Sequence, residues 1–320
     1  RGVALEVGVR CIVESTVQPW WGTELFGGPY IDRIEMVDYG NDPAAWLAAA
    51  EAEEVDLFYE TVGEFVDIMD SIGWSKTETV TAATLVIRPN QVAEVNGIVP
   101  YADSKARRAL AMAVDNQVCL ELGYSNRGVV AENHHVCPIH PAYAELEPLV
   151  HDPAGAKALM EEAGLADFEH ELITVDDDFE RNTGDAIAAQ LRDAGISIKR
   201  TVLPGATFWN DWTKYPFSAT TWNHRPLDVQ ILSLAYRTGE AWNESAFSNA
   251  EFDQLIADAL AIADADKRRV VMARIEKIMQ DEGVIIQPYW RSLYNHNRGD
   301  VVGAEKHPAH EFHFYKFGFA

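Results

Sequence analysis

Positive charge is scarce in this sequence of 320 residues. It contains 26 lysines and arginines against 50 aspartates and glutamates, which gives a formal net charge of −24 at pH 7. Nucleic acids and anionic membrane surfaces are bound mainly through clustered positive charge, and the chain has no Lys/Arg-rich run of that kind. The composition therefore excludes both as partners.

Long apolar runs are missing as well. No stretch approaches the roughly 18 consecutive apolar residues that a membrane span needs, and the first residues lack the charged start, apolar centre and cleavage site of a signal peptide. We expect a soluble protein from which any export signal has already been removed. A hydrophobic content of 48% is enough to build real cores, and the length predicts two or three domains.

Only three cysteines occur. Cys119 and Cys137 enclose a short segment that is rich in turn-forming glycine and asparagine. A disulfide between them is expected if the compartment is oxidising, and it would contribute about 3 kcal/mol in the loop-entropy model. Two free, buried thiols are the alternative, and Cys11 is expected to be a small core residue.

Motifs of the common enzymes are absent. The chain has no Gly-x-Ser-x-Gly, no Gly-x4-Gly-Lys-Ser/Thr and no Gly-x-Gly-x-x-Gly after a strand. His310 and His313 lie in a segment that alternates like a strand, where they would face opposite sides. Other residues that suit a metal lie in a proline-containing loop: His134, His135, Cys137 and His140. The acidic run 176–178 fits no recognised calcium loop. We predict no catalytic residue, no metal and no cofactor.

The apolar periodicity predicts an α/β fold. Asp42 with Pro43, and Asp152 with Pro153, are typical helix starts. Residues 171–203 indicate strand, helix and strand, an order that predicts a crossover between parallel strands. Further expected elements are strands around an aromatic loop at 19–30, helices at 63–72, 103–122, 248–263 and 266–281, and a strand-like tail at 307–320.

One aromatic segment carries the candidate binding residues. Within twenty residues it offers three indoles for stacking, a guanidinium for a carboxylate and two carboxylates for an amine. The residues are Trp209, Asp211, Trp212, Trp222, His224, Arg225 and Asp228. In the alternative interpretation the tryptophans are core and Arg225 pairs with Asp228 at the surface. Both interpretations stay open for Trp222 and Arg225, whereas core packing is favoured for Trp209 or Trp212.

Five segments together resemble one family, the extracytoplasmic solute-binding proteins of peptide-type ABC transporters, whose members bind dipeptides, oligopeptides, opines and nickel chelates. They occur in the family's order and spacing: PYADSKARRALAMAVD, DPAGAKALMEEAGL, IAAQLRDAGISIK, FSNAEFDQLIADAL and IEKIMQDEGVIIQPYW. The resemblance covers nearly the whole chain.

This resemblance implies a periplasmic-binding-protein-like fold of two lobes joined by hinge strands, with one lobe complete and the other partial. Residues 1–90 would form part of the first lobe, residues 91–288 the second lobe, and residues 289–320 a return to the first. Family members are longer and begin with a large segment that is missing here, so the sequence resembles a C-terminal portion.

The resemblance also implies that the segment 218–228 faces the ligand. The expected ligand-binding residues are Trp222, His224, Arg225 and Asp228, with Trp209 and Trp212 beside them. Asp228 would hold an amino group, and Arg225, which departs from the family's acidic pattern, suggests an anionic group on the ligand.

The expected function is the substrate-binding component of an ABC importer. It would be a periplasmic monomer without enzymatic activity, which captures a small peptide or related carboxylate-bearing solute and delivers it to a permease in the inner membrane. The alternatives are a ligand-binding sensor module without transport and a carboxylate-based hydrolase that uses Asp211 or Asp228.

Overall fold

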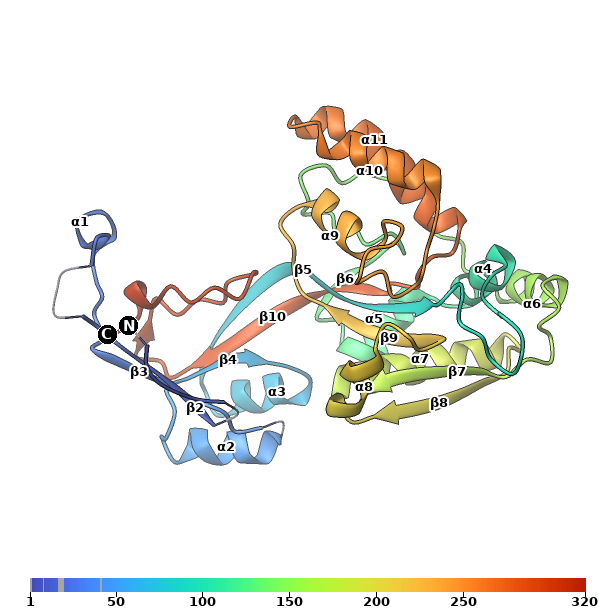
Figure 1. Ribbon diagram of the computed structural model, residues 1–320. Helices are drawn as coiled ribbons and strands as arrows, with labels where there is room; N and C mark the ends of the chain where they lie inside the picture. Colours follow the sequence, from blue (N-terminus) through green and yellow to red (C-terminus); the bar gives the residue numbers. More distant parts are fainter. Residues whose placement is uncertain (1, 8, 17–19, 41) are drawn as a thin grey trace. The chain divides into compact units, whose positions relative to one another are not determined.

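The computed structural model describes residues 2–7, 9–16, 20–40 and 42–320 (Figure 1). The chain divides into two compact units, Arg1–Thr79 with Leu293–Ala320, and Val80–Ser292. Both changes of unit fall inside long strands, β5 (Ser75–Pro89) and β10 (Tyr289–Asn297). Among the described residues, no helix is long and apolar enough to cross a membrane.

The smaller unit contains both helices and strands. Besides parts of β5 and β10 its elements are β1 (Gly2–Glu6), β2 (Arg10–Glu14), α1 (Thr23–Phe26), β3 (Arg33–Val37), α2 (Pro43–Glu51), β4 (Leu57–Thr61), α3 (Glu64–Ser71), β11 (Val301–Val302), η1 (Phe314–Lys316) and β12 (Gly318–Phe319). Strands β1, β2 and β3 form an antiparallel sheet in that order. The predicted start of α2 is confirmed, because the Asp42 side chain accepts a hydrogen bond from the Ala44 N–H. Pro19, the first residue of the expected aromatic loop, lies outside the described residues.

The tail of the smaller unit is not the strand that its alternation suggested. After the short β11, residues 303–313 make turns and irregular backbone, and only the two residues of β12 pair back onto β11. Pro308 removes a ladder donor, and His310 adopts a positive φ of 58°. The tail is held by side chains instead, with Phe312 stacked on Tyr59 at 3.9 Å between ring centroids.

The larger unit is built around a mixed sheet. Strand β9 (Phe217–Trp222) pairs antiparallel with β5 and parallel with β7 (His170–Val175), and β8 (Ile198–Leu203) pairs parallel with β7. Helix α7 (Asp178–Asp193) connects β7 to β8, so the predicted strand–helix–strand crossover is confirmed.

The other elements of the larger unit are α4 (Ser104–Met112), α5 (Asn116–Tyr124), β6 (Gly128–Val130), α6 (Pro153–Glu162), α8 (Gly205–Asp211), α9 (Asp228–Ala235), α10 (Ala250–Leu260) and α11 (Ala265–Asp281). The single helix expected at 103–122 is two helices. Asp115 breaks it, because its side chain accepts a hydrogen bond from Gln117 N–H and caps a new helix. Asp152 caps α6 as predicted, by accepting from Gly155 N–H.

Helices cover both faces of this sheet (Figure 1). Leu85 and Ile87 of β5 belong to the core cluster that includes residues of α4, α5 and α7, whereas Val86 belongs to the cluster that includes α9, α10 and α11. Strand β9 alternates in the same way, with Ala219 in the first cluster and Trp222 in the second. Trp222 therefore lies on the α9–α11 face of the sheet.

The expected disulfide between Cys119 and Cys137 is not formed. All three cysteines are free thiols in the structure. Cys119 lies in the first core cluster, where Gln190 Nε2 donates to its sulfur at 3.3 Å. Cys137 packs with Ala82, Ala131 and Trp290, and its thiol points to the Thr81 carbonyl oxygen at 3.7 Å. Burial raises the pKa of both thiols to about 12. The alternative of two buried thiols is the arrangement found.

We expect thiol titration in denaturant without reductant to detect three reactive sulfhydryl groups per chain. In the native state Cys119 and Cys137 should react slowly, because burial both blocks access and disfavours the thiolate. Ellman's reagent with and without guanidinium measures both quantities. A mass change on reduction of the unfolded monomer, or only one reactive thiol in denaturant, would contradict the structure.

Candidate functional site

Four tryptophans gather in the larger unit. Trp212, just after α8, lies 6.2 Å from Trp209, 6.2 Å from Trp222 and 6.3 Å from Trp242 between ring centroids, and Trp222 lies 5.9 Å from Trp242. All four contacts are edge-on, an arrangement that favours aromatic pairs. Trp222 is only 4% exposed, whereas Trp209 and Trp242 are 45% and 44% exposed. The cluster thus has a buried base and an accessible face.

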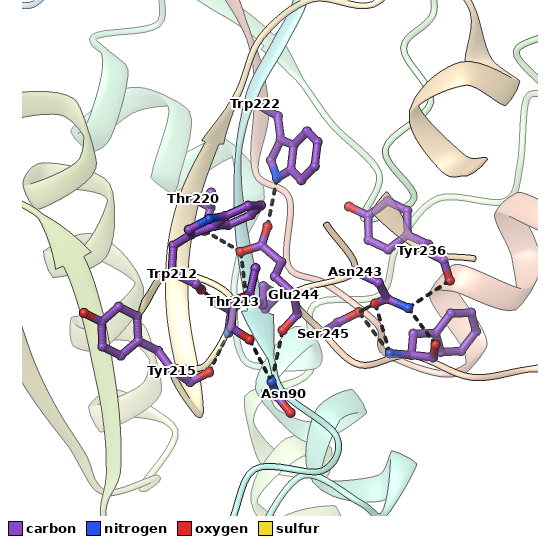
Figure 2. A network of polar contacts seen from close by, with 12 residues as sticks. Asn90, Trp212, Thr213, Tyr215, Thr220, Trp222, Tyr236, Asn243, Glu244 and Ser245 are labelled. Atoms are coloured by element: carbon purple, nitrogen blue, oxygen red, sulfur yellow. Dashed lines mark hydrogen bonds and ion pairs between the residues drawn. The ribbon is translucent and has the colours of Figure 1, made fainter. Parts of the chain in front are cut away.

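A buried carboxylate fixes the base of this cluster (Figure 2). Trp222 Nε1–H donates to Glu244 Oε1 at 2.9 Å, and Thr220 Oγ1 donates to Glu244 Oε2 at 2.6 Å. Arg88 Nε donates to the same Oε2 at 2.8 Å, and both charged side chains are almost fully buried. The register of β5 and β9 explains this convergence, because Arg88, Thr220 and Trp222 occupy the same face of the sheet.

Arg88 also fixes the position of Trp212. Its other guanidinium nitrogens donate to the Tyr215 carbonyl at 2.6 Å and to the Trp212 carbonyl. A guanidinium presents donors in a rigid fork, so one side chain can hold a carboxylate and two backbone groups together. The ion pair therefore orients two tryptophans. Glu244 holds the indole of Trp222, and Arg88 holds the backbone of Trp212.

Two asparagines hold the loops beside the ion pair. Asn90 Nδ2 donates to the Glu244 carbonyl at 3.2 Å and to the Thr213 carbonyl at 3.4 Å (Figure 2). Asn243 Nδ2 donates to the Phe247 carbonyl at 2.8 Å, and its Oδ1 accepts from the Phe247 N–H at 3.1 Å. The loop that carries Trp242 is thereby fixed without regular secondary structure.

Arg225 is half-buried at the end of β9, and its guanidinium has no acidic partner among the residues that the structure describes. Nη1 donates to the carbonyls of Asn223 at 3.3 Å and His224 at 3.1 Å. In the part of the chain that the structure describes, no carboxylate lies within ion-pair distance of Arg225. The proposed surface pair between Arg225 and Asp228 is therefore wrong, and Arg225 retains capacity to bind an anion.

Asp228 cannot serve as the expected ligand for an amino group. It is fully buried at the start of α9, where Oδ2 accepts from Ala142 N–H at 2.9 Å and Oδ1 accepts from Val229 N–H at 2.7 Å. Arg268 Nε lies 3.5 Å from Oδ1. This carboxylate anchors a loop and a helix to each other, so the expectation that it binds the ligand is wrong.

Histidines fix the backbone of the Arg225 loop. His224 Nδ1 accepts from Ala82 N–H at 3.0 Å. His140 Nε2–H donates to the Arg225 carbonyl at 2.9 Å, while its Nδ1 accepts from Cys137 N–H at 3.0 Å. Burial lowers the pKa of His140 to about 4, so the neutral ring that both contacts require is the form present at pH 7.

The histidine loop is structural. His135 Nδ1 contacts the hydroxyl of Tyr236 at 2.6 Å, and His134 Nδ1 accepts from Val136 N–H at 3.2 Å. Together with His140 and Cys137, these residues serve separate hydrogen bonds and do not converge on one point.

The larger unit also has a cavity away from the tryptophan cluster. A cavity of about 1270 Å³ lies between α4, α5 and the end of α11, lined by residues such as Met112, Glu132, Leu146 and Gln280. It contains none of the four tryptophans and no arginine of the β9 loop. We place the candidate site at the tryptophans, because the cluster exposes two indoles and the strand that carries Trp222 leads directly to Arg225.

On the opposite face of β9, Glu180 is buried beside the same strand end. Its Oε1 accepts from Thr221 Oγ1 at 2.6 Å. Burial, assisted by the charge of Asp177, raises the pKa of Glu180 to about 7. The folded protein therefore holds a proton here that the unfolded chain, with a glutamate pKa near 4.5, has lost at neutral pH.

We expect the wild-type protein to lose about 3 kcal/mol of stability relative to Glu180→Gln as the pH rises from about 4.5 to above 7. The sign follows because the folded-state pKa is the higher one, so the native state binds more protons throughout this window. Urea unfolding at a series of pH values measures the difference. Glu171→Gln is the control. The pKa of Glu171 is lowered by hydrogen bonds from Thr201 and Lys199, so the stability difference between the wild type and this variant should not change with pH above pH 5. Equal pH dependence in both variants contradicts the assignment.

The sequence pointed to Trp209, Trp212, Trp222 and Arg225 but missed Trp242, Arg88, Asn90 and Glu244, and Trp209, for which core packing was favoured, is 45% exposed. An arginine inside the apolar strand TAATLVIRP was the available signal, since a charge at such a position needs a buried partner. Nothing near Glu244 in the sequence identified it as that partner, because the two residues lie 156 positions apart.

Comparisons with known proteins agree with this architecture. Residues 11–244 match the family model for "Bacterial extracellular solute-binding proteins, family 5 Middle". The dipeptide-binding protein DppE of Bacillus subtilis (strain 168) is 24% identical over 234 residues, which are 65% of this chain and 41% of that protein. The chain thus matches about two fifths of that relative's length.

Two solved structures superpose on the whole chain. DppA from Helicobacter pylori, an ABC transporter-associated periplasmic binding protein in complex with the peptide STSA, has a TM-score of 0.84 at 16% identity and is covered to 62%. The oligopeptide-binding protein AppA from Bacillus subtilis, in complex with a nonapeptide, has a TM-score of 0.81 at 18% identity and is covered to 66%. At such identities the likeness shows the fold alone, and it confirms the predicted periplasmic-binding-protein-like α/β class.

Proposed function

Because this chain belongs to the bacterial extracellular solute-binding proteins of family 5, we propose that it is the solute-capturing part of an ABC importer. Its ligand is a small peptide or a related carboxylate-bearing solute. One observation carries the ligand class: Arg225, half-buried and without an acidic partner among the described residues, follows three positions after Trp222, the buried tryptophan at the base of the cluster. A guanidinium binds a carboxylate bidentately, and indole faces pack on apolar or planar side chains.

The resemblance to longer family members supports the remaining assignments of this proposal. The protein works outside the cytoplasm, in the periplasm, as a monomer that delivers its ligand to a permease in the inner membrane. The residues 80–292 belong to the second lobe, and the residues up to 79 with those from 293 belong to the first. The strands β5 and β10, in which the chain changes unit, are the hinge strands.

No observation at the site favours a catalytic role. Asp228, one of the two carboxylates considered for a hydrolase, is buried and bonded to backbone N–H groups. Asp211, the other, is exposed and paired with Lys214 at 2.6 Å. A sensor without transport would use the same binding residues, so the ligand assay below applies to both roles, and coupling to a permease separates them.

The proposal is tested by calorimetry on the intact protein. A panel of dipeptides to pentapeptides and opines should contain a ligand, and peptides with a free C-terminal carboxylate should bind more tightly than their C-terminal amides. Circular dichroism on the same sample reports that the fold is intact. A folded protein that binds no solute of the panel, or that prefers the amides, contradicts the proposed ligand class.

A further inference from the structure

The C-terminal tail of the smaller unit brings two imidazoles and a carboxylate together. Glu311 Oε2 lies 3.1 Å from His313 Nε2 and 3.9 Å from His307 Nε2. The three ligand atoms all lie within 4.8 Å of one another, and both histidines are half-buried. We propose that His307, Glu311 and His313 form a binding site for a divalent transition metal of the zinc type.

The backbone of the tail explains why these three residues meet. His310 N–H donates to the His307 carbonyl at 3.0 Å and closes a turn, and the positive φ of His310 reverses the chain. His313 then starts the short helix η1, whose Lys316 N–H donates to its carbonyl at 2.8 Å. Because the backbone turns at His310, the side chains of His307 and His313 both reach Glu311, whereas an extended strand would place residues six positions apart roughly 20 Å from each other.

The sequence pointed to the wrong pair of histidines. His310 and His313 are the obvious pair in His-Glu-Phe-His, and a strand would have separated them. In the structure His310 turns to Glu60, with 3.4 Å between Nδ1 and Oε2, and His307 takes its place beside Glu311. The relevant pattern is His-x-x-x-Glu-x-His.

The spacing of the ligand atoms suits a small metal ion. Zinc bonds of about 2.0–2.2 Å place neighbouring tetrahedral ligands roughly 3.3–3.5 Å apart. The contact between Glu311 and His313 is already that short, and the one between Glu311 and His307 closes by about half an ångström if the exposed Glu311 side chain rotates. Two imidazoles with one carboxylate suit zinc and its neighbours and leave a coordination position open.

Metal binding has one local cost. His307 Nδ1 accepts from the Ala309 N–H at 3.2 Å, so its proton lies on Nε2, the atom that faces Glu311. Coordination through Nε2 moves that proton to Nδ1 and releases the backbone contact. The weak, exposed hydrogen bond that is lost costs far less than a metal–imidazole bond provides. A chain of net charge −24 also attracts cations in general.

The test uses the full chain without an affinity tag, after EDTA treatment and dialysis, with Zn²⁺ as the titrant in calorimetry. One equivalent should bind, and Glu311→Gln and His313→Gln should each weaken binding at least about tenfold. His310→Gln is the matched control, because it removes a neighbouring histidine that faces Glu60, and it should leave the affinity unchanged. Zn²⁺ should raise the melting temperature of the wild type and of this control only.

Three results overturn the site: no saturable Zn²⁺ binding, affinity unchanged by both Glu311→Gln and His313→Gln, or a loss in His310→Gln as large as in those variants. Circular dichroism of the metal-free variants separates loss of ligands from loss of fold. The tail site is independent of the proposed transport role, since either can fail while the other holds.

Discussion

Glu244→Ala is expected to destabilise the larger unit by about 3–5 kcal/mol, because it leaves the Arg88 guanidinium buried without its counter-charge. The Trp222 indole N–H and the Thr220 hydroxyl lose their acceptor in the same step. The loss should appear in urea unfolding followed by circular dichroism, and the tryptophan fluorescence of the folded state should shift to the red as the cluster loosens.

Two further variants show whether the ion pair is the cause. Glu240→Ala removes a carboxylate from the same loop, but its pair with Arg237 is partly exposed, and we expect a loss below about 1 kcal/mol. The double replacement Arg88→Met/Glu244→Leu should recover most of the stability, since an apolar pair leaves no isolated charge. If Glu244→Ala costs no more than Glu240→Ala, the buried pair does not determine the stability of this region.

Arg225→Glu is expected to weaken binding of a carboxylate-bearing ligand at least about 100-fold. The change replaces the one guanidinium at the end of β9 that has only backbone carbonyls as partners with a charge that repels the ligand. The affinity of Arg225→Lys should lie between those of the wild type and Arg225→Glu, because an ammonium keeps the charge but loses the bidentate geometry. Calorimetry with the tightest ligand of the panel measures each affinity.

Lys214→Glu provides the control for this experiment. It makes the same change in net charge on an exposed side chain two positions after Trp212, where Lys214 pairs with Asp211. We expect its effect on affinity to be within about threefold, as exposed charges act weakly through screened solvent. Equal effects of the two reversals would mean that overall charge, and not contact with Arg225, sets the affinity.

Local signals in the sequence predicted the elements well. Asp42 and Asp152 cap the helices whose starts they predicted. The β7–α7–β8 crossover was predicted from the order of strand, helix and strand. Each of these inferences depends on residues within a few turns of one another. Where a strong local cap occurred inside an expected helix, as at Asp115, it split the helix.

The site was less predictable because its contacts are not local. Asp228 looked like a free loop carboxylate, yet its burial depends on Ala142 and Arg268, which come from elsewhere in the chain. Glu244 accepts the hydrogen bond that orients Trp222, and no feature of the sequence around Glu244 predicted this role. In the tail, one turn at His310 brought His307 and His313 together at Glu311, and alternation of residue types cannot report such a turn.

The ion pair of Arg88 and Glu244 also constrains how this sequence can change over generations. A substitution at either position alone passes through a protein with an uncompensated charge in its interior, so single steps away from the pair are costly. We therefore expect substitutions at the two positions to occur together, although 156 residues separate them. Lineages that have replaced one member should have replaced the other, and the indole that depends on Glu244 should vary with them.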